Sequence, residues 1–178
     1  MPTYKAPVED VKFLLNDVFH MERYGNMPGF ADASPDVVAA ILEEAAKFSE
    51  EVLTPLNRVG DLEGCKRQDD GTVLTPKGFK EAYRQMIDGG WVGISVPTEY
   101  GGQGLPATMT MIINEFLISS NMAFAMYPGL TQGAIAALLH HATDEQKKTY
   151  LPKMTTGEWT GSVRFTVPVH SPVVIFGR

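Results

Sequence analysis

Residues 89–106 read GGWVGISVPTEYGGQGLP, and this stretch decides how the rest of the chain is arranged. It is dense in glycine and proline, yet it also carries the apolar side chains Trp91, Val92, Ile94 and Val96. Glycines at its start suit the end of a helix, because they adopt a left-handed conformation without a Cβ clash, and its prolines forbid continued helix. A helical pattern precedes the stretch and another follows it. We therefore expect it to bury its apolar residues and to join two halves of a helical core.

Hydroxyl side chains mark the starts of three expected helices. Ser34 and Thr75 each precede a proline, and a hydroxyl cap followed by proline at the first helical position is a strong helix start. Thr143 stands three residues before Gln146, which is the spacing of a capping box. The helix that starts after Ser34 is expected to end or kink at Pro55.

The other segments are assigned from apolar periodicity and turn residues. Residues 8–19 have apolar side chains at helical spacing, and residues 60–74 are polar with an Asp-Asp-Gly turn signal. Residues 121–141 are very apolar and are expected to form two helical pieces divided at Pro128-Gly129. The small residues of this segment would allow close helix packing or leave room for a ligand.

The pattern changes after Gly157. Apolar and polar residues alternate from Trp159 to Thr166, which is typical of a strand, and residues 173–176 form a second short β-like run. The fold class expected is mainly α: a helical bundle of about six helices with a short β segment at the C-terminal end. The expected units are an extension of helix and loop over residues 1–33, a helical domain over 34–156 and the start of a β-domain over 157–178.

Composition excludes several classes of function. The chain has 178 residues and a net charge of −6, which argues against a nucleic-acid partner, since phosphate binding needs a basic surface. The one cysteine, Cys65, cannot form an internal disulfide, which fits a reducing compartment. No uninterrupted apolar run is long enough to predict a membrane span, and the N-terminus lacks a signal peptide pattern. A cytoplasmic protein is expected.

No catalytic or metal-binding residue is assigned from the residue pattern. His140 and His141 are adjacent, so on a helix their side chains point about 100° apart and do not converge on one ion. The glycine-rich run at residues 101–104 lacks the lysine and hydroxyl of a phosphate-binding P-loop. Chemistry read from the residues alone leaves a soluble, mostly helical domain.

Several stretches in order resemble the acyl-CoA dehydrogenase family. They are GWVGI at residues 90–94, VPTEYGGQG at 96–104, TDEQKK at 143–148, YLPKM at 150–154 and GEWTG at 157–161. The resemblance covers residues 35–161. The extra N-terminal helix, preceded by Tyr-Lys-Ala-Pro at residues 4–7, resembles the extension of a subgroup that includes the methylmercaptopropionyl-CoA dehydrogenases.

The resemblance implies a flavoprotein that uses FAD to form a trans-2,3 double bond in an acyl-CoA thioester. In this family a carboxylate base removes the α-proton while a hydride leaves the β-carbon for the flavin. Family members have an N-terminal helical domain, a middle β-domain and a C-terminal helical domain, and they assemble as homodimers or homotetramers. This chain would supply the first domain and the beginning of the second.

The resemblance also implies site residues. Phe165 and Thr166 fall in the run that binds the flavin, and the segment around Met126, Leu130 and Gly133 would line the acyl pocket. Ordinary helix-bundle core is the alternative for those three residues. The catalytic carboxylate of the family lies beyond the matching residues, so no residue here is assigned as the base.

The resemblance falls off sharply after Ser162, where the family's Glu is Val167 and its Gly-Ser-Asp is absent. This break predicts a truncated or frameshifted form that is inactive alone. The first hypothesis is thus the N-terminal fragment of a flavin-dependent acyl-CoA dehydrogenase. The alternative is a non-catalytic helical interaction domain that packs on a partner chain, and a fragment without a cellular role is a third reading.

Overall fold

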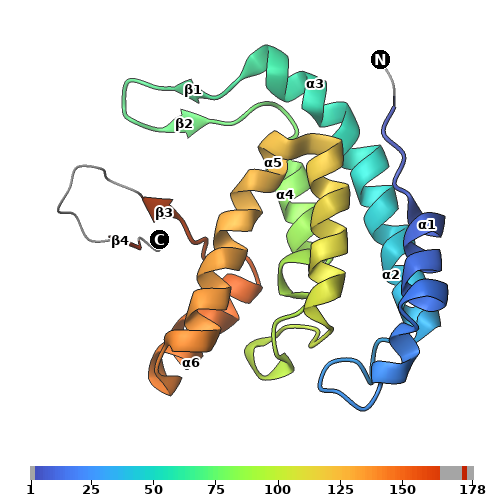
Figure 1. Cartoon of the computed structure of the whole chain (residues 1–178). Coiled ribbons are helices and arrows are strands. Elements are labelled where there is room, and N and C mark those ends of the chain that lie inside the picture. The colour runs from blue at the N-terminus through green and yellow to red at the C-terminus, as the bar shows by residue number, and fades with distance from the viewer. Residues whose placement is uncertain (1–2, 165–173, 176–178) are drawn as a thin grey trace, which may run out of the picture.

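A computed structural model describes residues 3–164 and 174–175, and these residues form a mainly helical fold, as the sequence predicts (Figure 1). The α-helices are α1 (Val8–Phe13), α2 (Pro35–Lys47), α3 (Thr54–Glu63), α4 (Phe79–Asp88), α5 (Ala107–His141) and α6 (Asp144–Thr155). Short π and 3-10 segments are η1 (Leu14–Val18), η2 (Met21–Tyr24), η3 (Phe48–Leu53), η4 (Trp91–Gly93) and η5 (Thr98–Tyr100). The strands are β1 (Lys66–Arg67), β2 (Val73–Leu74), β3 (Val163–Arg164) and β4 (Val174–Ile175).

The helix that starts at Ser34 is longer than the sequence predicts. The Ser34 hydroxyl accepts a hydrogen bond from the Val37 amide at 3.4 Å, which confirms the cap. α2 then runs into η3 and α3 without a break, so the expected end at Pro55 is wrong. The π-helical turn of η3 precedes Pro55, which stands in the first turn of α3, where proline is tolerated.

A β-hairpin occupies residues 66–74, where the sequence predicts only a polar, turn-rich loop. Lys66 lies opposite Leu74 and Arg67 opposite Val73 in an antiparallel pair. The Asp70 carboxylate closes the turn by accepting hydrogen bonds from the amide and the hydroxyl of Thr72, at 2.9 and 2.7 Å. This is the predicted Asp-Asp-Gly turn, and its flanking residues pair as strands.

The expected cap at Thr75 is wrong. α4 begins only at Phe79, after Gly78 in a left-handed conformation with φ of 86°. The turn before it is held by Glu63, whose carboxylate accepts a hydrogen bond from the Lys77 amide at 2.8 Å. A Cβ at Gly78 would stand 2.6 Å from the Leu56 side chain, so glycine suits both the left-handed conformation and the close approach to α3 at this position.

α5 is a helical hairpin whose bend lies at Asn121, not at Pro128-Gly129 as expected. Asn121 has non-helical backbone angles, φ of −157° and ψ of 88°, while Pro128 lies inside the helix. The Asn121 side-chain oxygen accepts a hydrogen bond from the Phe124 amide at 3.1 Å and so caps the second arm. Figure 1 shows the first arm, in yellow, running beside the second arm, in orange.

The central stretch buries three of its four apolar residues, as the sequence predicts, while Trp91 is only partly buried. Val92, Ile94 and Val96 are at most 4% exposed. The chain doubles back on itself, with the Gly104 amide bonded to the Val96 carbonyl at 2.9 Å. Gly93 lets it approach α6, since a Cβ there would stand 2.8 Å from the Thr155 methyl group. The stretch joins α4 to α5, and the two helical halves meet around a core that includes Leu42, Met109, Phe116 and Leu151.

The strand expected from Trp159 is wrong over residues 159–162, which form a bend and irregular chain. The Trp159 ring packs on Tyr150 of α6, with ring centroids 5.9 Å apart, and lies under the Lys153 ammonium at 4.6 Å. The Gly161 amide donates to the Thr131 hydroxyl of α5 at 3.2 Å. These contacts hold the segment against helices, and β3 beyond it pairs antiparallel with β4. The other residues of the expected β segment, 165–173 and 176–178, lie outside the described residues.

Candidate functional site

The second arm of α5 presents an apolar face to solvent, which we call the open face. It consists of Met122, Met126, Leu130, Gly133 and Ala137, which recur at helical spacing and are all exposed. Met126 is 63% exposed and Leu130 is 44% exposed. Among the described residues, a Cβ built at Gly133 meets nothing within 4 Å. The face is therefore an apolar surface with room beside it.

Contacts on the other sides of the arm fix the direction of the open face. The Asn114 amide of the first arm donates to the Gln132 carbonyl oxygen at 2.9 Å and ties the two arms together. The Thr131 hydroxyl accepts from the Gly161 amide, and Gly161 lies close to Ala134. Each contact lies on a face of the arm other than the open face, so the open face points away from the packed sides of the helix.

The acyl-pocket residues predicted from the resemblance lie together on this face. Met126, Leu130 and Gly133 follow one another by about one turn each. Their exposure shows that the described residues do not enclose them, so their role in a pocket stays a prediction. Phe165 and Thr166, predicted to bind the flavin, lie outside the described residues.

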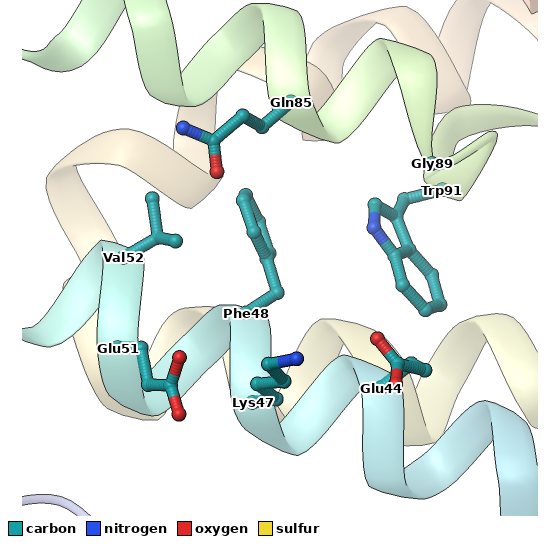
Figure 2. A pocket seen from close by; sticks show the side chains of 8 residues that line it. All are labelled: Glu44, Lys47, Phe48, Glu51, Val52, Gln85, Gly89 and Trp91. Carbon is teal, nitrogen blue, oxygen red and sulfur yellow. The ribbon is translucent and has the colours of Figure 1, made fainter.

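A hollow of about 300 Å³ lies between the α2–η3 helix and α4, and it is not among the features predicted from the sequence (Figure 2). Figure 2 shows the rings of Phe48 and Trp91 lining it, with Glu44 and Glu51 on the α2–η3 side. The lining carries two carboxylates, of Glu44 and Glu51, against the one ammonium of Lys47, so its net negative charge would repel the diphosphate of FAD. This hollow therefore does not fit the flavin that the resemblance implies.

Carboxylates of the described residues do not gather at the open face. Glu158 pairs with Lys153 at 3.1 Å, and Glu99 and Glu145 lie in the first turns of η5 and α6. Glu115 is exposed on the first arm. Within residues 3–164, moreover, no three His, Cys, Asp or Glu side chains converge as a metal site would need.

Tyr83 of α4 and Tyr127 of the second arm meet edge to face, with ring centroids 5.2 Å apart. Burial raises the pKa of Tyr83 to about 12, and the nearby Tyr127 adds to this. The Tyr83 phenol is consequently neutral at physiological pH and is no proton acceptor there. This pair contributes packing between α4 and α5 and brings no acid–base group to the open face.

The N-terminal segment is fastened to η3 by Glu50. One carboxylate oxygen accepts from the Ala6 amide at 3.0 Å, and the other pairs with the Lys5 ammonium. The hydrogen bond from Lys5 lowers the pKa of Glu50, and the Ala6 amide acts in the same direction. Val11 and Leu15 then bury their side chains in the core, so the extension is part of the same folded unit.

By length and composition α5 could cross a membrane, contrary to the expectation from the sequence. The core helix of a globular protein can have the same length and apolar composition. Met109 and Phe116 of its first arm are fully buried in the helical core, and the helix bends at Asn121. The open face, rather than the whole helix, is therefore the feature that needs a functional account.

Comparison with known proteins gives one family. Residues 35–158 match the model described as the N-terminal domain of acyl-CoA dehydrogenase. This range begins at the capped start of α2 and ends just after α6, so it includes both arms of α5. The N-terminal segment that Glu50 fastens lies before it.

Three relatives show how much of such a protein the chain represents. It is 39% identical over 166 residues to the 3-methylmercaptopropionyl-CoA dehydrogenase of Ruegeria pomeroyi, which covers 93% of this chain and 28% of the relative. It is 30% identical over 168 residues to a butyryl-CoA dehydrogenase of Syntrophomonas wolfei, covering 93% of this chain and 27% of that protein. It is 29% identical over 131 residues to the mitochondrial isovaleryl-CoA dehydrogenase of Pongo abelii, covering 71% and 28%. The chain thus spans little more than a quarter of the length of these relatives.

Proposed function

The chain belongs to the acyl-CoA dehydrogenase family, and we propose that it supplies the N-terminal helical domain of an enzyme that desaturates an acyl-CoA thioester between its α and β carbons. The observation that carries the proposal is the family match over residues 35–158, together with 39% identity to one relative over 93% of the chain. The structure supports it, because the matched range is one packed helical unit with an intact core.

We propose that Met126, Leu130 and Gly133 form one wall of the acyl pocket. An acyl chain needs a dry wall without charge and with some free volume, and the open face has both properties. The second wall would come from the part of the enzyme that follows the match. The described residues alone therefore bind no acyl chain in an enclosed site.

The family is FAD-dependent, and the flavin accepts the hydride from the β-carbon when it is bound. By resemblance, Phe165 and Thr166 are the residues of this chain proposed to touch it. The contribution proposed for the described residues is to orient and shield the acyl chain. The carboxylate that removes the α-proton is proposed to lie beyond residue 178.

A chimera tests this function directly. Residues 1–161 of this chain would replace the matching region of the Ruegeria pomeroyi relative, and flavin content and acyl-CoA-dependent reduction of an electron-accepting dye would be measured. The proposal expects a yellow protein that reduces the dye. A chimera that folds and binds flavin but reduces no dye would refute it, and the unaltered relative serves as the control.

A non-catalytic interaction domain is the second candidate, favoured by the exposed apolar side chains of the open face. The two candidate functions predict different colours for the purified protein and different activities for the chimera. An interaction domain would be purified without flavin, bound to another chain, and its chimera would show no dehydrogenase activity.

A further inference from the structure

The hollow between the α2–η3 helix and α4 has two aromatic walls. Figure 2 shows the rings of Phe48 and Trp91 on two sides of the same space, and Val52 adds an aliphatic surface. The volume of the hollow, about 300 Å³, lies at the lower end of the range for small-molecule sites. The hollow thus has room for one compact ligand with an apolar body.

Packing holds the two rings in place. Phe48 is only 8% exposed, and Trp91 is partly buried beside Val92, which is 4% exposed. The Trp91 indole lies directly against the backbone at Gly89, because a Cβ built there would overlap the indole nitrogen. Glycine at this position therefore makes room for the ring. Walls that are ordered before a ligand arrives lose little conformational entropy when it binds.

The rim of the hollow carries more negative than positive charge. The carboxylates of Glu44 and Glu51 and the ammonium of Lys47 belong to exposed residues of its lining. In the part of the chain that the structure describes, neither carboxylate takes part in an ion pair. The faces of aromatic rings are also electrically negative, so the walls and the rim attract the same kind of ligand, a cation.

We propose that this hollow binds a small organic ammonium ion. The methyl or methylene groups of the ion would pack between Phe48 and Trp91. Its charge would lie next to Glu44, whose carboxylate stands beside the Trp91 ring in Figure 2. The lining residues come from α2, η3, η4 and the end of α4, so the site is separate from the open face of α5. The proposal goes beyond the proposed function and does not depend on it.

Three other classes of ligand suit the hollow less well. A metal ion needs several oxygen, nitrogen or sulfur ligands, and within residues 3–164 no three His, Cys, Asp or Glu side chains converge to supply them. An anion, including the phosphate beside the choline group of a lipid, meets the net negative charge of the rim. A neutral apolar molecule would fill the space between the rings but would gain nothing from the carboxylates.

The test is a titration of the full chain with choline, which is a trimethylammonium ion, in a buffer free of amines. The matched neutral probe is 3,3-dimethylbutan-1-ol, which has a carbon atom in place of the charged nitrogen. Binding is followed by the fluorescence of Trp91 in a Trp159→Phe background, because these are the two tryptophans of the chain. Phosphocholine is titrated in the same way and tests whether a phosphate beside the ammonium is tolerated.

Two variants change the charge of the rim in opposite directions. Glu44→Gln removes a negative charge and should weaken choline binding about threefold to tenfold, whereas Lys47→Gln removes a positive charge and should strengthen it about threefold. Both positions are exposed, so neither substitution disturbs the core. Glu145→Gln, exposed on α6 away from the lining residues, is the control and should leave the affinity unchanged. Circular dichroism checks that all three variants fold as the parent chain does.

We expect choline to bind saturably, about tenfold more tightly than its neutral isostere and more tightly than phosphocholine. The absence of a saturable fluorescence change overturns the proposal, as does equal affinity for choline and the isostere. Tighter binding of phosphocholine overturns the assignment to a free ammonium ion. An effect of Glu44→Gln no larger than that of the control, or weaker choline binding by Lys47→Gln, also contradicts the proposal, because the charge of the rim would then not attract the cation.

Discussion

The Asn121 side-chain amide donates a hydrogen bond to the backbone carbonyl of Leu53, 3.2 Å away and 68 residues earlier in the chain. Asn121 is 1% exposed and Leu53 is fully buried, so the bond crosses the core between α5 and the end of η3. The same side chain caps the second arm of α5 through the Phe124 amide. One residue thus sets both the bend of the hairpin and its attachment to η3.

We expect Asn121→Ala to destabilise the chain by about 2–3 kcal/mol. Loss of the cap costs about 1 kcal/mol, and the buried Leu53 carbonyl left without its donor costs about 1–2 kcal/mol more. Asn121→Ser, which keeps a capping oxygen, should lose about half as much. Urea unfolding followed by circular dichroism measures this, with Asn57→Ala on the exposed surface of α3 as the control. Equal stability of Asn121→Ala and the control would show that Asn121 does not hold the bend.

Gly102→Ala should destabilise the central stretch by about 2–3 kcal/mol or more, because a Cβ at this position would overlap the Val96 carbonyl. The opposite result is expected at Gly129, where a Cβ meets nothing among the described residues. Gly129→Ala should stabilise the helix by about 0.5–1 kcal/mol, since alanine loses less backbone entropy than glycine. Thermal unfolding of both variants checks the pair, and a stable Gly102→Ala would contradict the close approach.

The sequence predicted those parts of the fold that depend on neighbours in the chain. The capping box is one example: the Gln146 amide bonds to the Thr143 hydroxyl at 3.3 Å, and the Gln146 side chain accepts from the Thr143 amide at 2.9 Å. Local sequence places the bend of α5 at Pro128, because proline disrupts a helix more strongly than asparagine does. The Asn121 side chain, however, makes two hydrogen bonds at the observed bend, and one of its partners, Leu53, is too distant in sequence for a local pattern to indicate it.

For the candidate site, the sequence predicts which residues share a helix face but not whether that face is buried. Helical spacing places Met126, Leu130 and Gly133 on one face, and the structure has them there. Spacing does not say whether that face is buried, since burial depends on what packs against it. The hollow between η3 and α4 was missed because it arises from the approach of Phe48 to Trp91, which are distant in sequence.

The attachment of the N-terminal segment should weaken in acid. The pKa of Glu50 is lowered, chiefly by the Lys5 hydrogen bond, so its contribution to stability is present above the ordinary glutamate pKa of about 4.3 and is lost as the pH falls through the lower folded value. We expect Glu50→Ala to melt below the parent chain at pH 7, and the difference to shrink towards zero at acid pH. Thermal melts across this range test it, with Glu51→Ala as the control. A difference independent of pH would exclude the charge of Glu50 as its cause.

Gly133 offers a test of the acyl wall in the covalent chimera. Gly133→Leu should leave the isolated chain folded, because the position opens onto solvent among the described residues. In the chimera the added side chain should fill the proposed pocket and shift the preference towards shorter acyl-CoA thioesters. The ratio of kcat/KM for long and short substrates measures this, with Ala136→Leu, exposed on the same arm but outside the open face, as the control. An unchanged ratio would remove Gly133 from the pocket.

The chain as given should not oxidise an acyl-CoA. Removal of the α-proton requires a carboxylate within hydrogen-bond reach of it, and the flavin must be held against the β-carbon. The acidic residues nearest in sequence to the open face are Glu115 and Asp144, which lie beyond the two ends of residues 116–143, a span without Asp, Glu, Lys or Arg. Glu158 is committed to Lys153 at 3.1 Å. The experiment adds excess FAD, an acyl-CoA and an electron-accepting dye to the purified chain and measures the rate of dye reduction. We expect this rate to equal that of a blank without protein. Dye reduction above the blank would contradict this prediction. If Glu115→Gln then abolished the reduction, the base would lie within this domain and not beyond residue 178, as proposed.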